Sequence, residues 1–150
     1  MGRYANTTSV SVDKSRDEIE KILIRYGADE FGYMRKKDYV IVGFKFINRN
    51  IRFVVPIPSH EAFETTETGR ERSKSSANAA YEQAIKQRWR ALALLIKAKL
   101  EAVDSNIGHF EEEFLPYIVL PNGKTVAETI LPNVEEMYST GKTIPLLEMK

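Results

Sequence analysis

Basic side chains concentrate between residues 69 and 100, where eight Lys or Arg stand against two Glu. If this stretch is a helix, with about 100° per residue, Lys86, Arg90 and Lys97 project from one side. Ammonium and guanidinium groups in such a row can follow the phosphates of a nucleic acid and release its counterions. Three further basic residues would form a mobile arm before the helix: Arg70, Arg72 and Lys74. The same side chains are also typical of an ordinary solvated helix face.

A second basic cluster consists of Arg35, Lys36 and Lys37, which lie between two predicted strands. Sheet faces and hairpin tips often bind single-stranded nucleic acids, so these residues are further candidates for phosphate contact. Charged hairpin tips also protect a sheet against pairing with another edge, which is the alternative role. Tyr81 and Trp89 would stack on bases if they were exposed, or pack in the core if they were not.

The remaining polar residues form no recognisable catalytic or metal-binding motif. Glu111, Glu112 and Glu113 are consecutive, so on a helix they point about 100° apart and do not converge on one ion. They suit the first turn of a helix, where negative charge is favourable. His60 and His109 have no ligand spacing around them. We therefore expect no metal and no cofactor, and the sequence argues against an enzyme without excluding one.

The composition is that of a globular domain. The chain has 150 residues, a net charge of +1, 43% apolar and 29% charged residues, and no cysteine. The absence of cysteine excludes disulfides and agrees with a cytoplasmic protein. No stretch approaches the roughly 18 apolar residues of a membrane span. Residues 101–150 carry nine acidic against three basic residues, so the charge is sorted along the chain, as in proteins with a polyanion partner or a regulated surface.

The N-terminal half predicts strands around one helix. Residues 7–12 are β-branched and alternate, which predicts a strand. Ser15 and Glu18 match a capping box, and apolar residues follow at helical spacing up to a stop at Gly27. Three strands joined by short polar loops come next: residues 30–34, 39–47 and 51–56.

The middle of the chain predicts a loop and a long helix. Residues 59–76 lack periodicity and contain one large apolar residue, so we expect a flexible polar loop. Residues 77–103 predict the long helix, whose apolar stripe is Tyr81, Ile85, Trp89, Leu92, Ile96, Leu100 and Val103.

The C-terminal region is predicted to be short and mainly helical. It begins with an acidic helix near residues 110–115 and contains a turn at Asn122-Gly123. A second capping box, Thr125 with Glu128, opens helical pieces that Pro132 is expected to interrupt. Together these elements predict one α+β domain over residues 1–150: strand, helix and a three-strand antiparallel meander, backed by one long helix.

Five stretches carry a resemblance to known proteins: residues 3–10, 88–92, 96–103, 110–115 and 120–126. Together they resemble a family of small proteins encoded by tailed phages and prophages, over about residues 3–147, with residues 59–76 the least similar. The resemblance implies a phage or prophage origin and action in the cytoplasm of the bacterial host. It supplies no activity and no functional residue.

Two functions remain open from the sequence. One is a non-enzymatic nucleic-acid-binding protein of phage DNA metabolism, selective for single strands or for structure, which could assemble into a homo-oligomer with a continuous basic groove. The other is a protein-interaction module, an inhibitor or adaptor that binds a host or phage protein. No helix-turn-helix or zinc finger is visible, so the sequence gives little support to base readout in a major groove.

Overall fold

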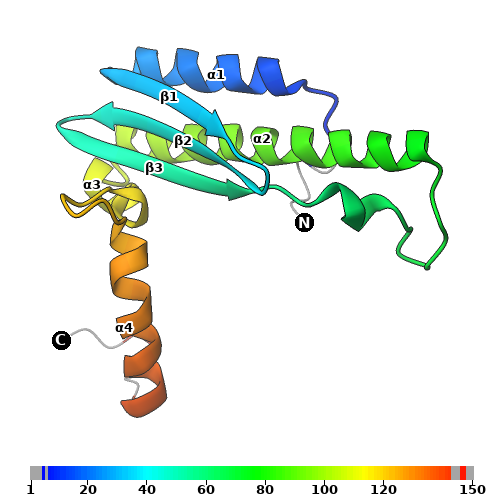
Figure 1. Ribbon diagram of the computed structural model, residues 1–150. Helices are drawn as coiled ribbons and strands as arrows, with labels where there is room; N and C mark the ends of the chain where they lie inside the picture. Colours follow the sequence, from blue (N-terminus) through cyan, green and yellow to red (C-terminus); the bar gives the residue numbers. More distant parts are fainter. Residues whose placement is uncertain (1–4, 6, 143–145, 148–150) are drawn as a thin grey trace.

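The structure is a computed structural model that describes Ala5, residues 7–142 and residues 146–147. Its first half holds helix α1 (Val12–Arg25) and the strands β1 (Glu30–Arg35), β2 (Tyr39–Phe46) and β3 (Arg49–Pro56). Its second half holds η1 (His60–Phe63), α2 (Lys74–Asp104), α3 (Phe110–Glu113), η2 (Leu115–Tyr117) and α4 (Val126–Thr140). The predicted α+β class is confirmed: an antiparallel meander is backed by one long helix, with a helical C-terminal region (Figure 1).

The sheet has two chemically different faces. The strands pair in the order β1-β2-β3, and alternation puts every second side chain on the same face. One face carries the buried residues of the sheet: Val40, Val42, Phe44, Ile51 and Phe53. The other face, here called the open face, carries Met34, Ile41 and Val54 as cross-strand neighbours. Met34 is 52% and Val54 50% exposed, so the open face keeps an apolar row in contact with solvent.

Helices α1 and α2 pack against each other and against the buried face of the sheet. The predicted stripe of α2 supplies most of the core, from Ile85 to Leu100, and α1 adds Ile19, Ile22 and Leu23. A hydrogen bond from the Tyr26 hydroxyl to Glu101, 3.3 Å long, joins the end of α1 to α2. The long helix is therefore covered by α1 on one side and by the sheet on another.

The N-terminal strand predicted at residues 7–12 is wrong. Helix α1 begins at Val12, and the hydroxyl of Ser11 caps it by accepting a hydrogen bond from the backbone N–H of Lys14. The Thr8 hydroxyl accepts from the N–H of Val10, so this segment satisfies its backbone locally, without a strand partner. The predicted cap, Ser15, lies one turn inside the helix and is fully buried, because α1 packs against the core on that side.

Residues 59–76 contain more regular structure than the sequence suggested. They include η1 and a turn closed by an antiparallel bridge between Thr65 and Glu71. Arg72 holds this turn, because its backbone N–H donates to the carbonyl of Glu64 and its guanidinium donates to the carbonyl of Phe63. Helix α2 begins earlier than predicted, at Lys74, with Ser73 as its N-cap.

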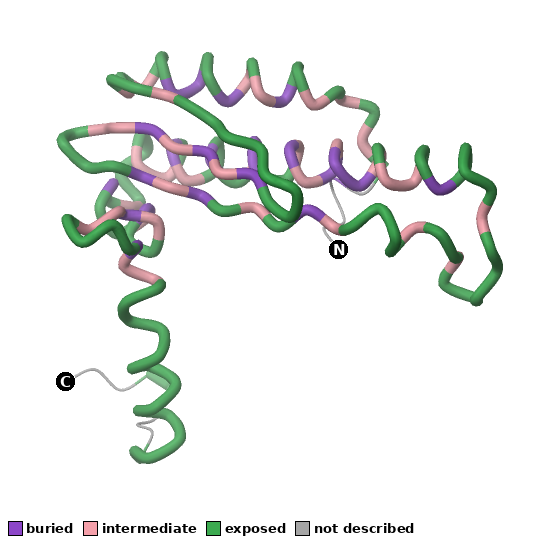
Figure 2. The backbone as a smooth tube through the Cα atoms, viewed as in Figure 1, coloured by how far each residue is buried: buried purple, intermediate pink, exposed green. Residues whose placement is uncertain are grey.

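The C-terminal region ends in a helix that leaves the rest of the molecule. The predicted capping box of Thr125 and Glu128 is confirmed, and α4 ends at Thr140 with Gly141 as its C-cap. The predicted interruption at Pro132 is wrong, since α4 is one continuous helix through this residue. None of its residues is buried, and it points away from the sheet and from both long helices (Figures 1 and 2).

Candidate functional site

The basic residues predicted on one side of α2 do not form a free row. Arg90 donates to Glu18 of α1 at 2.5 Å, so the side of α2 that was expected to face solvent is partly covered by α1. Lys86 is half-buried, and Lys97 is exposed at a shallow cleft between α1 and α2. That cleft also carries acidic groups, Asp17 and Glu18, so its charge is mixed.

Tyr81 of α2 links the β1–β2 turn, which carries three of the other predicted basic residues, to η1, which precedes the remaining three. The guanidinium of Arg35 donates to the Tyr81 hydroxyl at 3.0 Å, which joins the β1–β2 turn to α2. The ring of Tyr81 also contacts η1, with centroids 5.0 Å from His60. Lys36 and Lys37 are exposed in the same turn. Of the basic residues 70–74, Arg70 and Lys74 are exposed, whereas Arg72 is engaged in its own turn.

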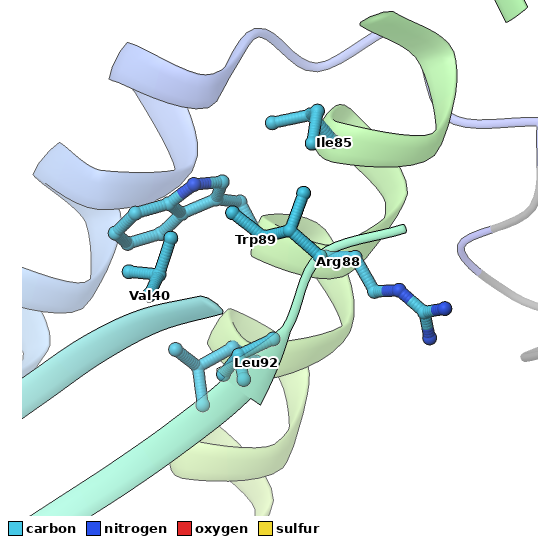
Figure 3. A pocket seen from close by; sticks show the side chains of 7 residues that line it. Val40, Ile85, Arg88, Trp89 and Leu92 are labelled. Atoms are coloured by element: carbon cyan, nitrogen blue, oxygen red, sulfur yellow. The ribbon is translucent and has the colours of Figure 1, made fainter. Parts of the chain in front are cut away.

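The aromatic residue expected to stack on bases is not available for that role. Trp89 is 5% exposed and packs edge-on against Tyr33, with ring centroids 5.9 Å apart. It also lines a small apolar recess with Val40 and Leu92, at which Arg88 extends toward solvent (Figure 3). The recess holds about 10 Å³, roughly the room of one water molecule and too little for a ligand.

The acidic and histidine residues show no convergent site in the described chain. Glu111 forms an ion pair with Arg49 at 2.9 Å, and His109 is the residue before α3, as expected. No group of three His, Cys, Asp or Glu residues within the described ranges could hold a metal ion. None of the helices in those ranges is long and apolar enough to cross a membrane.

Helix α4 carries an apolar surface that is exposed to solvent. Its apolar residues fall on one arc of about 140° and its polar residues on the rest. The apolar residues, here called the α4 stripe, are Val126, Ala127, Ile130, Leu131, Val134, Met137 and Tyr138. Leu131 is 61%, Met137 69% and Tyr138 72% exposed. Pro132 lies on the polar side, so it leaves the stripe uninterrupted.

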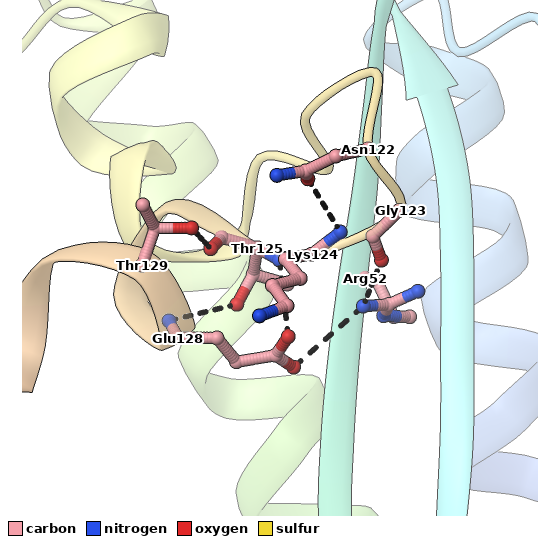
Figure 4. A network of polar contacts seen from close by, with 7 residues as sticks. All are labelled: Arg52, Asn122, Gly123, Lys124, Thr125, Glu128 and Thr129. Carbon is pink, nitrogen blue, oxygen red and sulfur yellow. Dashed lines mark hydrogen bonds and ion pairs between the residues drawn. The ribbon is translucent and has the colours of Figure 1, made fainter.

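A polar network fixes the start of α4 on the sheet (Figure 4). Arg52 of β3 donates to the carbonyl of Gly123 at 2.9 Å and forms an ion pair with Glu128 at 3.6 Å. Thr125 is buried and caps the helix, and the N–H of Val126 donates to the carbonyl of Ile118. The direction in which α4 leaves the body is therefore held by several contacts with β3 and with the segment beside it.

Beside this network, the open face of the sheet is hollowed. Gly32 and Gly43 are cross-strand partners, so two adjacent strands lack a side chain at the same level. The depression over them measures about 480 Å³, and its rim includes Ile41, Lys45 and Arg52. The open face therefore combines an apolar row and a glycine floor with charges of both signs, Glu30 and Lys45, and with Arg52, which is paired with Glu128.

The α4 stripe was not predicted as a site, although its spacing is present in the sequence. Apolar residues recur at positions 127, 130, 131, 134, 137 and 138, which is the pattern of a helix face. Pro132 suggested two separate pieces, each too short for a stripe. The open face could not be predicted without the strand register, which places Met34, Ile41 and Val54 in one row.

Comparisons with known proteins found no matching family model, no matching curated protein and no matching solved structure.

Proposed function

We propose that this chain is a non-catalytic protein-interaction module that presents α4 to a protein partner. One observation carries the proposal: the α4 stripe is exposed along a 15-residue helix of which no residue is buried. Amphipathic helices commonly bind by placing such a stripe in an apolar groove of another protein, with contacts at i, i+3, i+4 and i+7. Burying each large side chain of the stripe would contribute about 1.5–3 kcal/mol before the costs of association.

The structure of the rest of the chain is consistent with a presenting role. The core lies in the sheet, α1, α2 and the α3–η2 segment, so α4 adds little to it. The network of Arg52, Thr125 and Glu128 holds α4 in a defined direction, which lowers the entropy lost on binding.

A photocrosslinking residue in α4 tests the proposal. Placed at Leu131, on the stripe, it should crosslink to protein in the host cell, whereas placed at Glu136, on the polar side of α4, it should not. The two positions are both exposed, so accessibility alone does not distinguish them. Equal crosslinking from both positions, or from neither, would contradict the proposal.

A second candidate function, nucleic-acid binding, is favoured by the contact between Arg35 and Tyr81. It ties the basic β1–β2 turn, with Lys36 and Lys37, to Tyr81, which also packs against η1 of the segment that carries Arg70 and Lys74. If these cations contact phosphates, four contacts give a slope of roughly −2.8 in log affinity against log salt for a single strand. Fluorescence anisotropy with single- and double-stranded oligonucleotides at two salt concentrations measures this. No binding at low salt, or binding insensitive to salt, would rule this function out. We expect either function to be exercised in the bacterial cytoplasm, as the resemblance to phage proteins implies.

A further inference from the structure

Two glycines lie opposite each other in the sheet, although the backbone does not require glycine at either position. Gly32 of β1 and Gly43 of β2 are cross-strand partners, and neither has a positive φ. A Cβ on Gly32 would meet nothing within 4 Å, and a Cβ on Gly43 would lie 3.4 Å from the carbonyl oxygen of Ile51. Glycine inside a strand lowers stability, and it often marks a place where a ligand approaches the backbone closely. The pair is therefore better explained by a ligand than by the fold.

The depression over these glycines has the size of a binding site. Exposure of the open face is by itself no evidence of a ligand, because antiparallel sheets commonly leave one face in solvent. The depression of about 480 Å³ is a separate observation, and ligand sites usually measure roughly 300–1,000 Å³. Its floor consists of the peptide groups of two strands without a Cβ above them, so a flat ring can lie directly on it.

The two sides of the depression differ in chemistry. Ile41 borders it on one side. On the other side Glu30 and Lys45 are cross-strand partners, and Asn50 is the next neighbour of Lys45 on β3. Among the described residues neither Glu30 nor Lys45 has an ion-pair partner, whereas Arg52 is already held by its own chain. A carboxylate, an ammonium and an amide therefore offer both acceptors and donors along one edge of the depression.

This combination matches a nucleobase. A base is a flat ring with apolar faces and with hydrogen-bond donors and acceptors along its edge. Lying on the glycine floor, a base would turn that edge toward Glu30, Lys45 and Asn50. An apolar side chain of a partner protein would fill the same space but leave the three polar groups unmatched.

The same face carries a second stacking surface, with cations beside it. Tyr39 lies on the open face of β2, four residues before Gly43 and about 14 Å from it, and is 36% exposed. Lys36 is opposite Tyr39, with its N–H bonded to the Tyr39 carbonyl at 2.8 Å, and Lys37 follows; both lysines are exposed. A shallow depression covers only one face of a base, so a strand gains from stacking a further base and from phosphate contacts.

We propose that the open face binds a single-stranded nucleic acid, with one base in the depression over Gly32 and Gly43 and another on the ring of Tyr39. The inference rests on the second candidate function, nucleic-acid binding, and names the surface that contacts the bases. Lys36 and Lys37 would contact phosphates of the same strand. The basic turn alone would bind a strand without regard to its bases, whereas the open face adds contacts to the bases themselves.

Fluorescence anisotropy with labelled single-stranded DNA and RNA tests the proposal. Gly32→Val fills the depression and should weaken binding about tenfold, because one base loses its stacking surface. The slope of log affinity against log salt should stay the same, because no phosphate contact is lost. Val54→Ile is the control: it adds aliphatic volume to the same face outside the depression and should not change the affinity. Circular dichroism verifies that each variant is folded.

Two further positions keep the test valid if Gly32→Val unfolds. Tyr39→Ala should weaken binding about tenfold, whereas Tyr39→Phe should bind like the wild type, because the ring remains. Asn50→Ala should reduce the differences in affinity among strands of a single base type, again without changing the salt slope. A Tyr39→Phe variant as weak as Tyr39→Ala would overturn the stacking on this ring.

The failure of this inference can be told apart from the failure of nucleic-acid binding as a whole. If Gly32→Val binds like the wild type, while replacing Lys36 and Lys37 with Gln weakens binding, only phosphates are contacted and the inference is wrong. Absence of any binding at low salt rejects both. Equal competition by a mononucleotide and by a strand would show a nucleotide site instead of a strand site. None of these variants alters α4, so the test of the α4 stripe is independent.

Discussion

Glu18 of α1 accepts a hydrogen bond from Arg90 of α2, at 2.5 Å, across 72 residues of sequence. Both side chains are mostly buried: 24% of the Arg90 side chain and 32% of the Glu18 side chain are exposed. The pair lies between the two long helices, so Arg90 serves their packing as well as contributing charge. Reversing the charge of Arg90 would place two carboxylates together and disturb the fold, which would confuse any test of phosphate binding at this position.

We expect this ion pair to stabilise the fold by about 1 kcal/mol, at the upper end for partly exposed pairs. A double-mutant cycle with Glu18→Gln and Arg90→Gln, followed by denaturant unfolding, measures the coupling. Lys97→Gln, an exposed position on the same helix, should change stability little. A coupling energy indistinguishable from zero would mean that the contact does not hold α1 to α2.

Replacing Ser11 or Ser15, at the start of α1, with Ala should have different effects on the stability of the fold. Ser11→Ala removes the N-cap hydrogen bond to Lys14 and should cost about 1 kcal/mol. Ser15 is fully buried and its hydroxyl has no hydrogen-bond partner, so Ser15→Ala should leave stability unchanged or raise it. Thermal melts of the two variants compare them directly. A larger loss from Ser15→Ala than from Ser11→Ala would show that the buried hydroxyl is satisfied.

The centre of the α2 stripe should be the most sensitive part of the core. Leu92 is 5% exposed and Ile96 is not exposed at all, and each contacts the core cluster. Replacing either with Ala should cost about 2–5 kcal/mol of unfolding free energy, because a cavity replaces the lost side chain. Lys97→Ala is the neighbouring control and should cost little. Similar melting temperatures for the Ile96 and Lys97 variants would contradict the assigned face of α2.

The β2–β3 turn contains a residue in an unfavourable conformation. Ile47 has φ of 48° and Asn48 has φ of 58°, as both central residues of a type I′ turn require. A β-branched side chain is disfavoured there, and Ile47 is 64% exposed, so it gains little from packing. Ile47→Gly should therefore stabilise the fold by roughly 1 kcal/mol in urea unfolding. A loss of stability would indicate that the Ile47 side chain has a contact that offsets its backbone strain.

Trypsin tests the segment 59–76. The sequence predicted a flexible loop here, in which Arg70, Arg72 and Lys74 would all be open to cleavage. In the structure Arg72 is held by the carbonyls of Glu64 and Phe63, whereas Arg70 is exposed beside the turn. We expect cleavage after Arg70 first. Cleavage after Arg72 should become faster once Phe63 is replaced by Ala, because this removes the ring that packs against Tyr81, with centroids 6.2 Å apart, and loosens η1. Equal rates at both sites in the wild type would mean that the turn opens readily in solution.

The elements that could be predicted are those that local chemistry decides. The three strands, the α2 stripe and the Thr125 cap follow from alternation, helical spacing and a capping box, and each is present. The first helix start was missed because Ser15, with Glu18 three residues later, matches a capping box better than Ser11, which is followed by Lys14 at that spacing. Only the burial of Ser15 by the rest of the fold shows that it lies inside the helix.

The surfaces could be predicted less well than the elements, because they depend on which elements meet. The pairing of Arg90 with Glu18 requires α1 to lie along α2, and the row of Met34, Ile41 and Val54 requires the strand register. The continuity of α4, and with it the α4 stripe, was missed for a different reason. A proline inside a helix usually ends it, but Pro132 lies on the polar side, where the change in backbone leaves the apolar positions in phase.

The position of α4 after the core residues affects how the protein is made. Ile118 is the most C-terminal of the buried apolar residues in the described chain, and α4 follows it. Synthesis runs from the N-terminus, so the residues of the core are made before those of α4. The body can therefore be complete before α4 emerges from the ribosome, so the apolar stripe would first meet solvent on a protein that is already folded.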